Sequence, residues 1–222
     1  MPTYYAPMEG YAGSKVGERY FTIVGSPTYS STYAQYGTTS GLFTSGAQLT
    51  RTGIGGTTTW LQGYTKIAGL SANTGFWLGG MLPYDITGLV VTANAGATAV
   101  TFAFGEAYYS VGYQNVSTTT HPIGAGAAWF RWQYRNGPTS STYNIFTGAN
   151  INGASPNITA TTTASTYFGA NSSTSFFVHN YLTIGAGSFT AYFDNLVVSD
   201  TQPSATAPSY VPFSSVGMIN AV

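Results

Sequence analysis

The chain has 222 residues, of which six are Lys or Arg and six are Asp or Glu, so its formal net charge is zero and only 5% of it is charged. A neutral chain lacks the basic patch that nucleic acid or an anionic membrane surface would attract, and we expect neither partner. Its aromatic content of 16% excludes a disordered chain. No apolar run approaches the roughly 20 residues that a membrane-spanning helix needs.

The polarity of the chain comes from neutral side chains, with 34 Thr, 22 Ser and 12 Asn. Cysteine is absent, which excludes disulfides, zinc–thiolate sites and thiol nucleophiles. The opening residues, Met1 to Tyr5, have neither a basic nor an apolar signal region, so we expect no secretory signal.

Apolar residues alternate along most of the chain, and Gly, Pro, Asn and Ser clusters interrupt them at intervals typical of a β-sandwich or barrel. The pattern predicts thirteen strands, and a fold of about 12 to 14, paired antiparallel because no helical crossover separates them. The predicted strands span 19–24, 28–36, 47–51, 57–67, 75–82, 86–94, 98–105, 107–114, 127–136, 141–147, 157–163, 174–185 and 189–199.

Alternation also predicts which side chains are buried. Along 127–136, one face carries three aromatic residues that we assign to the core, and the other faces solvent or a partner with Trp129, Arg131, Gln133 and Arg135. The turn at Asn136–Gly137 predicts a hairpin with 141–147. The predicted inter-sheet core comprises Phe102, Phe104, Phe130, Trp132, Val178, Leu182, Phe193 and Val197.

Residues 1–200 are predicted to form a single sandwich domain, and 201–222 an extended arm. The arm contains three prolines, which favour an extended path, and it has no charged residue. Because a solvated tail is usually charged and poor in aromatics, we expect this arm to dock on a neighbouring subunit or on a larger particle. The alternative is that it folds back over its own sandwich. Its candidate assembly residues are Tyr210, Phe213, Met218 and Ile219.

The last predicted strand reads Ala191-Tyr192-Phe193-Asp194-Asn195-Leu196-Val197-Val198-Ser199-Asp200, and a short acidic–glycine element, Met8-Glu9-Gly10-Tyr11, lies near the N-terminus. Both resemble concanavalin A-like (laminin-G-like) jelly-roll sandwiches of the kind found in tailed-bacteriophage virion proteins. The resemblance implies that these elements lie side by side. It also implies that Asp194 and Asn195 bond to backbone near the N-terminal strand; some members of the family bind calcium nearby.

No pattern of catalytic residues emerges from the sequence. Glucanases of this fold cluster acids on one strand, whereas the six acids here are never closer than six residues apart. Glu106 is the strongest single candidate, and we interpret it as a surface acid at a strand end. His121 and His179 have no assignable partners, and no Gly-x-Ser-x-Gly elbow is present. We therefore predict a protein that is not an enzyme, with no cofactor and no catalytic or metal site.

Aromatic side chains offer the other route to function, because exposed Trp and Tyr stack on sugars and anchor protein interfaces. Among the four tryptophans, Trp129 is least typical of a core, and Trp129, Arg131 and Arg135 form the candidate sugar or partner contact.

Two functions follow from these features. The first is a non-enzymatic structural protein of a phage particle, either a surface decoration or a minor tail component, located in the virion and bound to other virion proteins and copies of itself. The alternative is a lectin-like or receptor-binding module that uses exposed Trp and Tyr to bind a host cell-surface glycan. A glycan hydrolase or lyase is disfavoured by the scattered acids.

Overall fold

A computed structural model describes residues 3–18, 20–52, 58–81, 86–106, 114–115, 120–137, 140–162, 175–179 and 187–204. At residues 52, 80–81, 86–87, 104–106, 114–115, 162 and 175–179 the description is limited to the backbone. Within these ranges the chain forms sixteen strands and one short 3-10 helix, η1 (Gly148–Asn150). None of the described helical structure is long and apolar enough to span a membrane.

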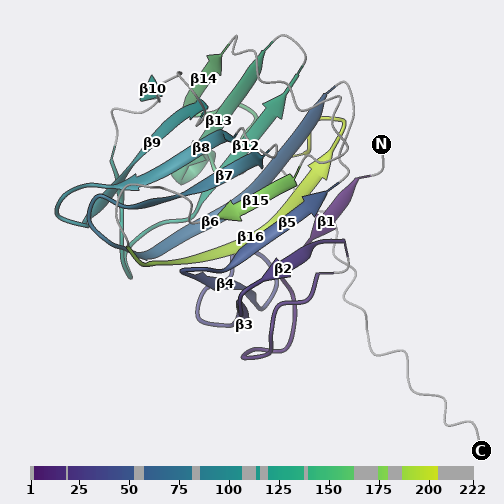
Figure 1. Cartoon of the computed structure of the whole chain (residues 1–222), viewed down its shortest axis with the longest axis vertical. Helices are drawn as coiled ribbons and strands as arrows, with labels where there is room; N and C mark the ends of the chain where they lie inside the picture. Colours follow the sequence, from purple (N-terminus) through teal and green to yellow (C-terminus); the bar gives the residue numbers. More distant parts are fainter. Residues whose placement is uncertain are drawn as a thin grey trace, which may run out of the picture.

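The strands pair antiparallel in two sheets that face each other (Figure 1). The first sheet has the order β14-β13-β12-β6-β16-β4-β3, with β1 also on β16. Its strands are β1 (Tyr4–Ala6), β3 (Thr28–Ser30), β4 (Ser40–Thr44), β6 (Thr59–Leu70), β12 (Phe130–Asn136), β13 (Ser141–Thr147), β14 (Ile158–Thr162) and β16 (Phe189–Ser199).

The second sheet has the order β10-β9-β8-β7-β15-β5-β2, with β11 also on β9. Its strands are β2 (Thr22–Val24), β5 (Gln48–Thr52), β7 (Gly75–Met81), β8 (Ile86–Ala93), β9 (Ala99–Glu106), β10 (Gln114–Asn115), β11 (His121–Pro122) and β15 (Ser175–His179). The predicted fold class, an all-β antiparallel sandwich, is confirmed.

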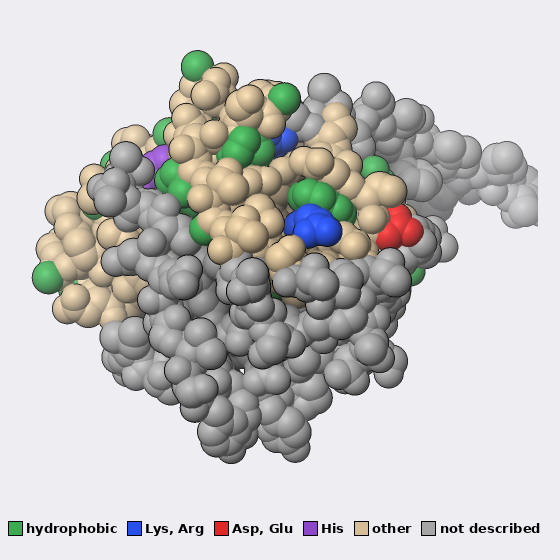
Figure 2. Space-filling view, turned by 90° about the horizontal axis from the view of Figure 1, so that it is seen from above, with side chains coloured by type: hydrophobic (Ala, Val, Ile, Leu, Met, Phe, Trp, Pro, Cys, Tyr) green, Lys and Arg blue, Asp and Glu red, His purple; other side chains and the backbone are tan. Residues whose placement is uncertain are grey.

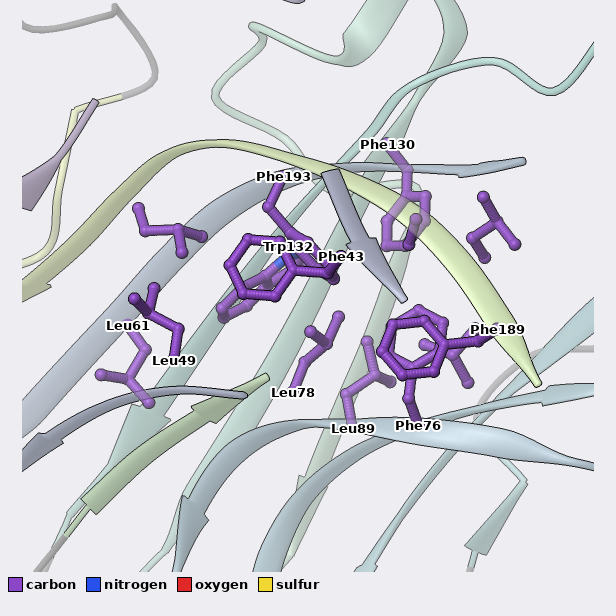
Figure 3. Packing of buried hydrophobic residues seen from close by; sticks show 14 of the residues in the cluster. Phe43, Leu49, Leu61, Phe76, Leu78, Leu89, Phe130, Trp132, Phe189 and Phe193 are labelled. Atoms are coloured by element: carbon purple, nitrogen blue, oxygen red, sulfur yellow. The ribbon is translucent and has the colours of Figure 1, made fainter. Parts of the chain in front are cut away.

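One hydrophobic core fills the space between the sheets (Figure 3). Aromatic rings bridge the two layers: Phe76 of the second sheet stacks on Phe189 of the first at 5.2 Å between centroids, and Phe102 meets Phe130 edge-on at 5.1 Å. Trp132 is fully buried, and its indole N–H donates to Thr65 Oγ1 at 3.0 Å. The buried polar end of this large ring is therefore satisfied.

The predicted core is confirmed at Phe102, Phe130, Trp132 and Phe193, which all belong to this cluster. The side chains of Phe104, Val178 and Leu182 lie outside the described part of the chain. Val197 is buried but does not join the cluster, so its assignment to the inter-sheet core was wrong.

A β-bulge explains the error at Val197. The pairing of β16 with β6 shifts between Asp194 and Val197, and Asn195 adopts a positive φ of 45°. An inserted residue reverses the alternation beyond it. Leu196 and Val198 therefore point into the core, and Val197 points to the outer side of the first sheet.

Strand prediction succeeded where alternation was regular. The bounds predicted for β13 and β16 match the structure, and the predicted hairpin pairs β12 with β13 from Phe130↔Thr147 to Asn136↔Ser141. The strand predicted at 28–36 ends at Ser30, because 31–39 form a loop. Three short strands, β1, β4 and β11, were missed, which is why the structure exceeds the predicted number.

The two ends of the sandwich meet on one strand. β1 pairs with the end of β16 in the register Tyr4↔Val198 and Ala6↔Leu196, and Thr3 Oγ1 lies 3.1 Å from Ser199 Oγ. The predicted neighbourhood of the N-terminal and C-terminal elements is thus confirmed, although the pairing uses 4–6 rather than Met8 to Tyr11.

Candidate functional site

The outer face of the first sheet carries polar and aromatic side chains in rows that cross the strands. Directly paired residues share a face, so the registers define the rows. One row joins Ser199, Trp60, Arg135, Thr142 and Thr161; the next joins Val197, Gln62, Gln133, Asn144 and Thr159. A third joins Asp194, Tyr64, Arg131 and Phe146.

The third row and the residues beyond it form a covered half of this face, comprising Tyr64, Lys66, Arg131, Phe146, Tyr192 and Asp194. Two loops, 31–39 and 148–157, lie over it. Asn152 Oδ1 accepts hydrogen bonds from Tyr36 Oη at 2.7 Å and from Tyr64 Oη at 2.9 Å, which ties both loops to β6. Tyr33 packs edge-on against Tyr192 with 5.0 Å between ring centroids.

Arg131 lies in the covered half and is only 1% exposed. Its guanidinium lies 3.7 Å from the ring centroid of Phe146, and Nη2 donates to Gly153 O at 2.6 Å. Nε and Nη1 are buried with no hydrogen-bond partner among the described residues. Burial lowers the pKa of Arg131 from its ordinary value, but a guanidinium remains charged in proteins.

The beginning of the C-terminal segment crosses the second row. Gln62 Nε2 donates to Ser204 O at 3.0 Å, and Gln133 Nε2 donates to Gln62 Oε1 at 2.7 Å and to Pro203 O at 3.3 Å. The side-chain amides of two neighbouring strands thus bind backbone carbonyls of this segment. Both Gln side chains are buried as a result.

No described segment covers the remaining part of the outer face, and we call this part the Trp60 face. Its six residues combine one aromatic platform, one cation and neutral hydrogen-bonding groups: Trp60, Arg135, Thr142, Asn144, Thr159 and Thr161. All six are half-buried or exposed. Two hydrogen bonds tie its outer strands together, Thr159 Oγ1 to Asn144 Oδ1 at 3.0 Å and Thr142 Oγ1 with Thr161 Oγ1 at 3.3 Å.

Trp60 and Arg135 are directly opposite each other on β6 and β12. Directly opposite Cβ atoms in an antiparallel pair are about 4.5–5.5 Å apart, so the two side chains leave the sheet from neighbouring positions. The Arg135 guanidinium extends toward the hairpin turn and lies beside Gly137. The recorded side-chain bond of Arg135 is a long one, from Nη1 to Ser140 Oγ at 3.5 Å. Where the view from above shows described residues, most of the surface is backbone and side chains that are neither hydrophobic nor charged, and few charged side chains are in view (Figure 2).

Three carboxyl groups lie away from the Trp60 face and anchor the N-terminal segment and loop 31–39. Asp194 Oδ2 accepts the N–H groups of Gln35 and Tyr36 at 2.9 and 3.0 Å. Glu9 Oε1 accepts the N–H of Thr38 at 2.9 Å, and Glu18 Oε1 accepts the Tyr29 hydroxyl at 3.1 Å.

Burial is the main cause that raises the pKa of two of these carboxyl groups. It raises the pKa of both Glu18 and Asp194 to about 7, and the charge of Glu9 adds to the effect at each. Hydrogen bonds from Tyr29 and Met8 to Glu18, and from the backbone to Asp194, act in the opposite direction. Both groups therefore change charge near neutral pH.

The resemblance implied that Asp194 bonds to backbone near the N-terminal strand. Asp194 is a fully buried acceptor of backbone N–H groups, but its donors come from loop 31–39. Among the described residues, no three His, Cys, Asp or Glu side chains come close enough to hold a metal. Asp194 Oδ2 accepts two N–H donors, and its Oδ1 is buried with no hydrogen-bond partner in the described part of the chain.

Of the two histidines, only His121 has a described side chain. Its ring packs between Phe102 and Phe130, at 5.2 and 5.3 Å, and burial lowers its pKa. Its Nε2 is buried without a hydrogen-bond partner in the described part of the chain. These aromatic contacts favour a packing role for His121.

The structure separates the three residues predicted as a sugar or partner contact. Arg135 is accessible at the open end of β12, and Trp129 is half-buried just before that strand begins. Arg131 and Gln133 lie on the outer face as predicted, but they face neither solvent nor a partner, because loop 148–157 and the segment 202–204 cover them. Any direct contact by Trp129 or Arg135 stays a prediction. The predicted assembly residues Tyr210, Phe213, Met218 and Ile219 lie outside the described residues.

Sequence reasoning placed Trp60 among the aromatics but did not pair it with Arg135. A signal was present, because Trp60, Gln62, Tyr64 and Lys66 alternate with the apolar and small positions of β6. That alternation marks an outward polar stripe. The missing information was the register between β6 and β12, which are far apart in the sequence.

No protein-family model matches the sequence, and no curated protein matches it either. Solved structures do match. Domain 4 of an extracellular GH43 arabinanase from Geobacillus stearothermophilus, in complex with arabinotriose, has a TM-score of 0.56 and 14% identity, covering 83% of this chain and 84% of that one. An alginate lyase from Klebsiella pneumoniae has a TM-score of 0.52 and 10% identity, covering 78% and 84%.

A botulinum neurotoxin type C chain that interacts with two ganglioside molecules matches with a TM-score of 0.50 and 9% identity, covering 83% of this chain. The present chain spans only 44% of the length of that toxin chain. At these identities the likeness shows the fold. The chain shares the β-sandwich architecture of these three structures.

Proposed function

We propose that this protein is a non-catalytic carbohydrate-binding module and that the Trp60 face is its glycan-binding surface. The observation that carries the proposal is the placement of Trp60 directly opposite Arg135, at the end of a row that continues through Thr142 to Thr161. The glycan-bound or glycan-interacting structures with the same fold support it.

The chemistry of the Trp60 face suits a sugar. One face of a pyranose ring is apolar and packs on an indole, while its hydroxyls exchange hydrogen bonds with neutral amide and hydroxyl groups. Asn144, Thr142, Thr159 and Thr161 supply such groups beside Trp60. Neighbouring strands are about 4.8 Å apart, so the row from β6 to β14 extends over about 14 Å, the length of a short oligosaccharide.

Binding without turnover fits the placement of the acids. A retaining glycosidase needs two carboxyl groups about 5–5.5 Å apart flanking the scissile bond. None of the six residues of the Trp60 face is acidic. The carboxyl groups of Glu9, Glu18 and Asp194 instead accept hydrogen bonds from the chain itself.

The test is a glycan array with the wild-type protein, followed by titration of the best ligand against two variants. Trp60→Ala removes the stacking platform, and we expect its affinity to fall by about tenfold or more, the equivalent of an aromatic contact worth about 1.4 kcal/mol. Trp60→Phe keeps an aromatic ring and is expected to retain most of the binding. A Trp60→Ala variant that binds its glycan as tightly as wild type would contradict the proposal.

A second candidate function, a structural part of a phage particle in the virion, is favoured by one observation. The exposed large apolar side chains of the described residues all lie within the first 24 residues: Tyr5, Tyr11, Tyr20 and Val24, at 41–86% exposure. Exposed large apolar side chains concentrated in one segment of the chain suit a protein partner. In this proposal, other virion proteins or a second copy of the chain cover these side chains. Mass spectrometry of purified virions tests the proposal, and absence of this chain from the virions would exclude it.

A further inference from the structure

Basic residues are distributed unevenly over this neutral protein. Three of its six basic side chains, Lys66, Arg131 and Arg135, point to the outer face of the first sheet. The acid paired onto the same rows is Asp194, which is fully buried at the far side of the covered half. The rows of the outer face therefore hold three basic side chains and one acid, and Asp200 directly follows Ser199, which pairs with Trp60.

The three cations differ in the hydrogen bonds and ring contacts that the protein provides to them. Lys66 Nζ donates to the carbonyl oxygen of Ala127 and lies 4.5 Å from the ring centroid of Tyr33. Arg131 keeps two nitrogens without a partner among the described residues. Arg135 is half-buried, and its recorded side-chain bond is the long contact to Ser140.

Arg135 is the cation that a ligand on this face can reach. Arg131 is covered by Gly153, and Lys66 by loop 31–39 and the backbone at Ala127. Arg135 lies directly opposite Trp60 on the neighbouring strand. The guanidinium lies toward the hairpin turn at Gly137 and Ser140, so a glycan stacked on the indole would meet it by extending toward that turn.

We propose that the glycan bound on the Trp60 face is acidic, with a carboxylate that pairs with Arg135 while a sugar ring stacks on Trp60. This inference rests on the proposed carbohydrate-binding function and narrows its ligand class. Arg131 and Lys66 act from behind the face, because buried charges in a low-dielectric region add to the field that attracts an anion.

Energetics favour an anionic over a neutral ligand. A neutral glycan would cover Arg135 and remove water from its guanidinium without supplying a counter-charge, which costs free energy. A carboxylate forms charge-assisted hydrogen bonds with guanidinium, and these are roughly twice as strong as neutral ones. The Trp60 face contains no acid that would repel such a ligand.

The experiment compares glycans that carry a free carboxylate with related glycans that do not. The pairs are polygalacturonate against its methyl ester and alginate against its esterified form, with sialyllactose against lactose as an oligosaccharide pair. We expect at least one acidic member to bind about tenfold or more tightly than its neutral partner, the gain of a charge-assisted hydrogen bond. A sulfated galactan beside neutral agarose tests sulfate as the alternative anion.

Two variants that each remove one positive charge test whether the preference for the acidic glycan depends on Arg135. Arg135→Gln is expected to abolish the preference for the acidic member while keeping residual binding through Trp60. Lys15→Gln removes one charge from an exposed site outside this face and is expected to retain the preference.

Four outcomes would overturn the inference. Equal binding to both members of every pair would refute the acidic ligand, but the proposed carbohydrate-binding function would stand. An unchanged preference in Arg135→Gln would refute the assigned contact, and binding of the sulfated galactan alone would refute the carboxylate. Absence of binding to every glycan on the array and in the pairs would refute the proposed function together with the inference.

Discussion

The covered half and the Trp60 face lie on the same strands, a few residues apart along each, yet they differ in almost every respect. In the covered half, Tyr64 and Asp194 are fully buried, and their polar atoms bond to loops 31–39 and 148–157. On the Trp60 face, Arg135 and Trp60 have no loop over them among the described residues. In both regions the alternation places polar side chains on the outer face. The loops then determine whether these side chains are buried structural groups or stay accessible to a ligand.

The first prediction tests whether the covered half is structural. Asp194→Ala would remove the acceptor of the N–H groups of the half-buried residues Gln35 and Tyr36. We expect the free energy of unfolding to fall by about 2–4 kcal/mol, since one unsatisfied buried group costs about 1–3 kcal/mol. Urea denaturation followed by tryptophan fluorescence measures the loss.

Two variants serve as controls for this prediction. Asp194→Asn keeps an acceptor oxygen, so it should lose much less stability than Asp194→Ala. Thr161→Ala, on the Trp60 face, should change stability by no more than about 0.5 kcal/mol. Equal stability of Asp194→Ala and wild type would show that loop 31–39 does not depend on this carboxylate.

The second prediction concerns the pH dependence of the free energy of unfolding, which we attribute to Asp194 in the covered half and to Glu18. The pKa values of Glu18 and Asp194 are about 7 in the folded protein, against 4.5 and 3.8 in the unfolded chain. The folded state therefore binds more protons between about pH 4 and 7. Stability is fully present at the acidic end of this range and is lost as pH rises through 7.

We expect the pH-dependent loss to be about 1–3 kcal/mol, discounted for the partial exposure of Glu18. His121 acts in the opposite direction, because a lowered histidine pKa costs stability as pH falls below about 6.5. The effects are separated by subtracting the wild-type free energy of unfolding from that of a variant at each pH. The stability of Glu18→Gln relative to wild type should rise between pH 4.5 and 7.5, and a flat difference would show that Glu18 titrates normally.

The third and smallest effect concerns Arg131. Arg131→Met removes a buried charge and two nitrogens that lack partners, while keeping an apolar chain against Phe146. It also loses the bond to Gly153 O. We expect stability to change by at most about 1 kcal/mol, toward a gain. A loss above about 3 kcal/mol in thermal or urea unfolding would mean that Arg131 has a counter-charge in the folded protein.

Alternation was enough to predict most of the sandwich. It gave the bounds of β13 and β16 and the β12–β13 hairpin, because these strands have one buried and one polar face. It missed β4, whose five residues include Ser40, Gly41 and Thr44 and therefore resemble a loop. β1 has only three residues, too few to show a period.

The candidate site was less predictable, for two physical reasons. Alternation tells which side of a strand a residue occupies but not what covers that side, so Arg131 and Gln133 were expected in solvent. The register between strands far apart in sequence is set by the tertiary packing of the two sheets. The pairing of Trp60 with Arg135 therefore emerged only from the structure.

The pairing of β1 with the end of β16 has a mechanical consequence. Thr3 and Ser199 face each other at the same end of this antiparallel pair, with their hydroxyl oxygens 3.1 Å apart. Tension applied through the two ends of the sandwich acts across these strands rather than along them. The backbone hydrogen bonds of β1 then break one after another instead of sharing the load. β1 is therefore expected to peel away at low force, while the rest of the sandwich stays folded.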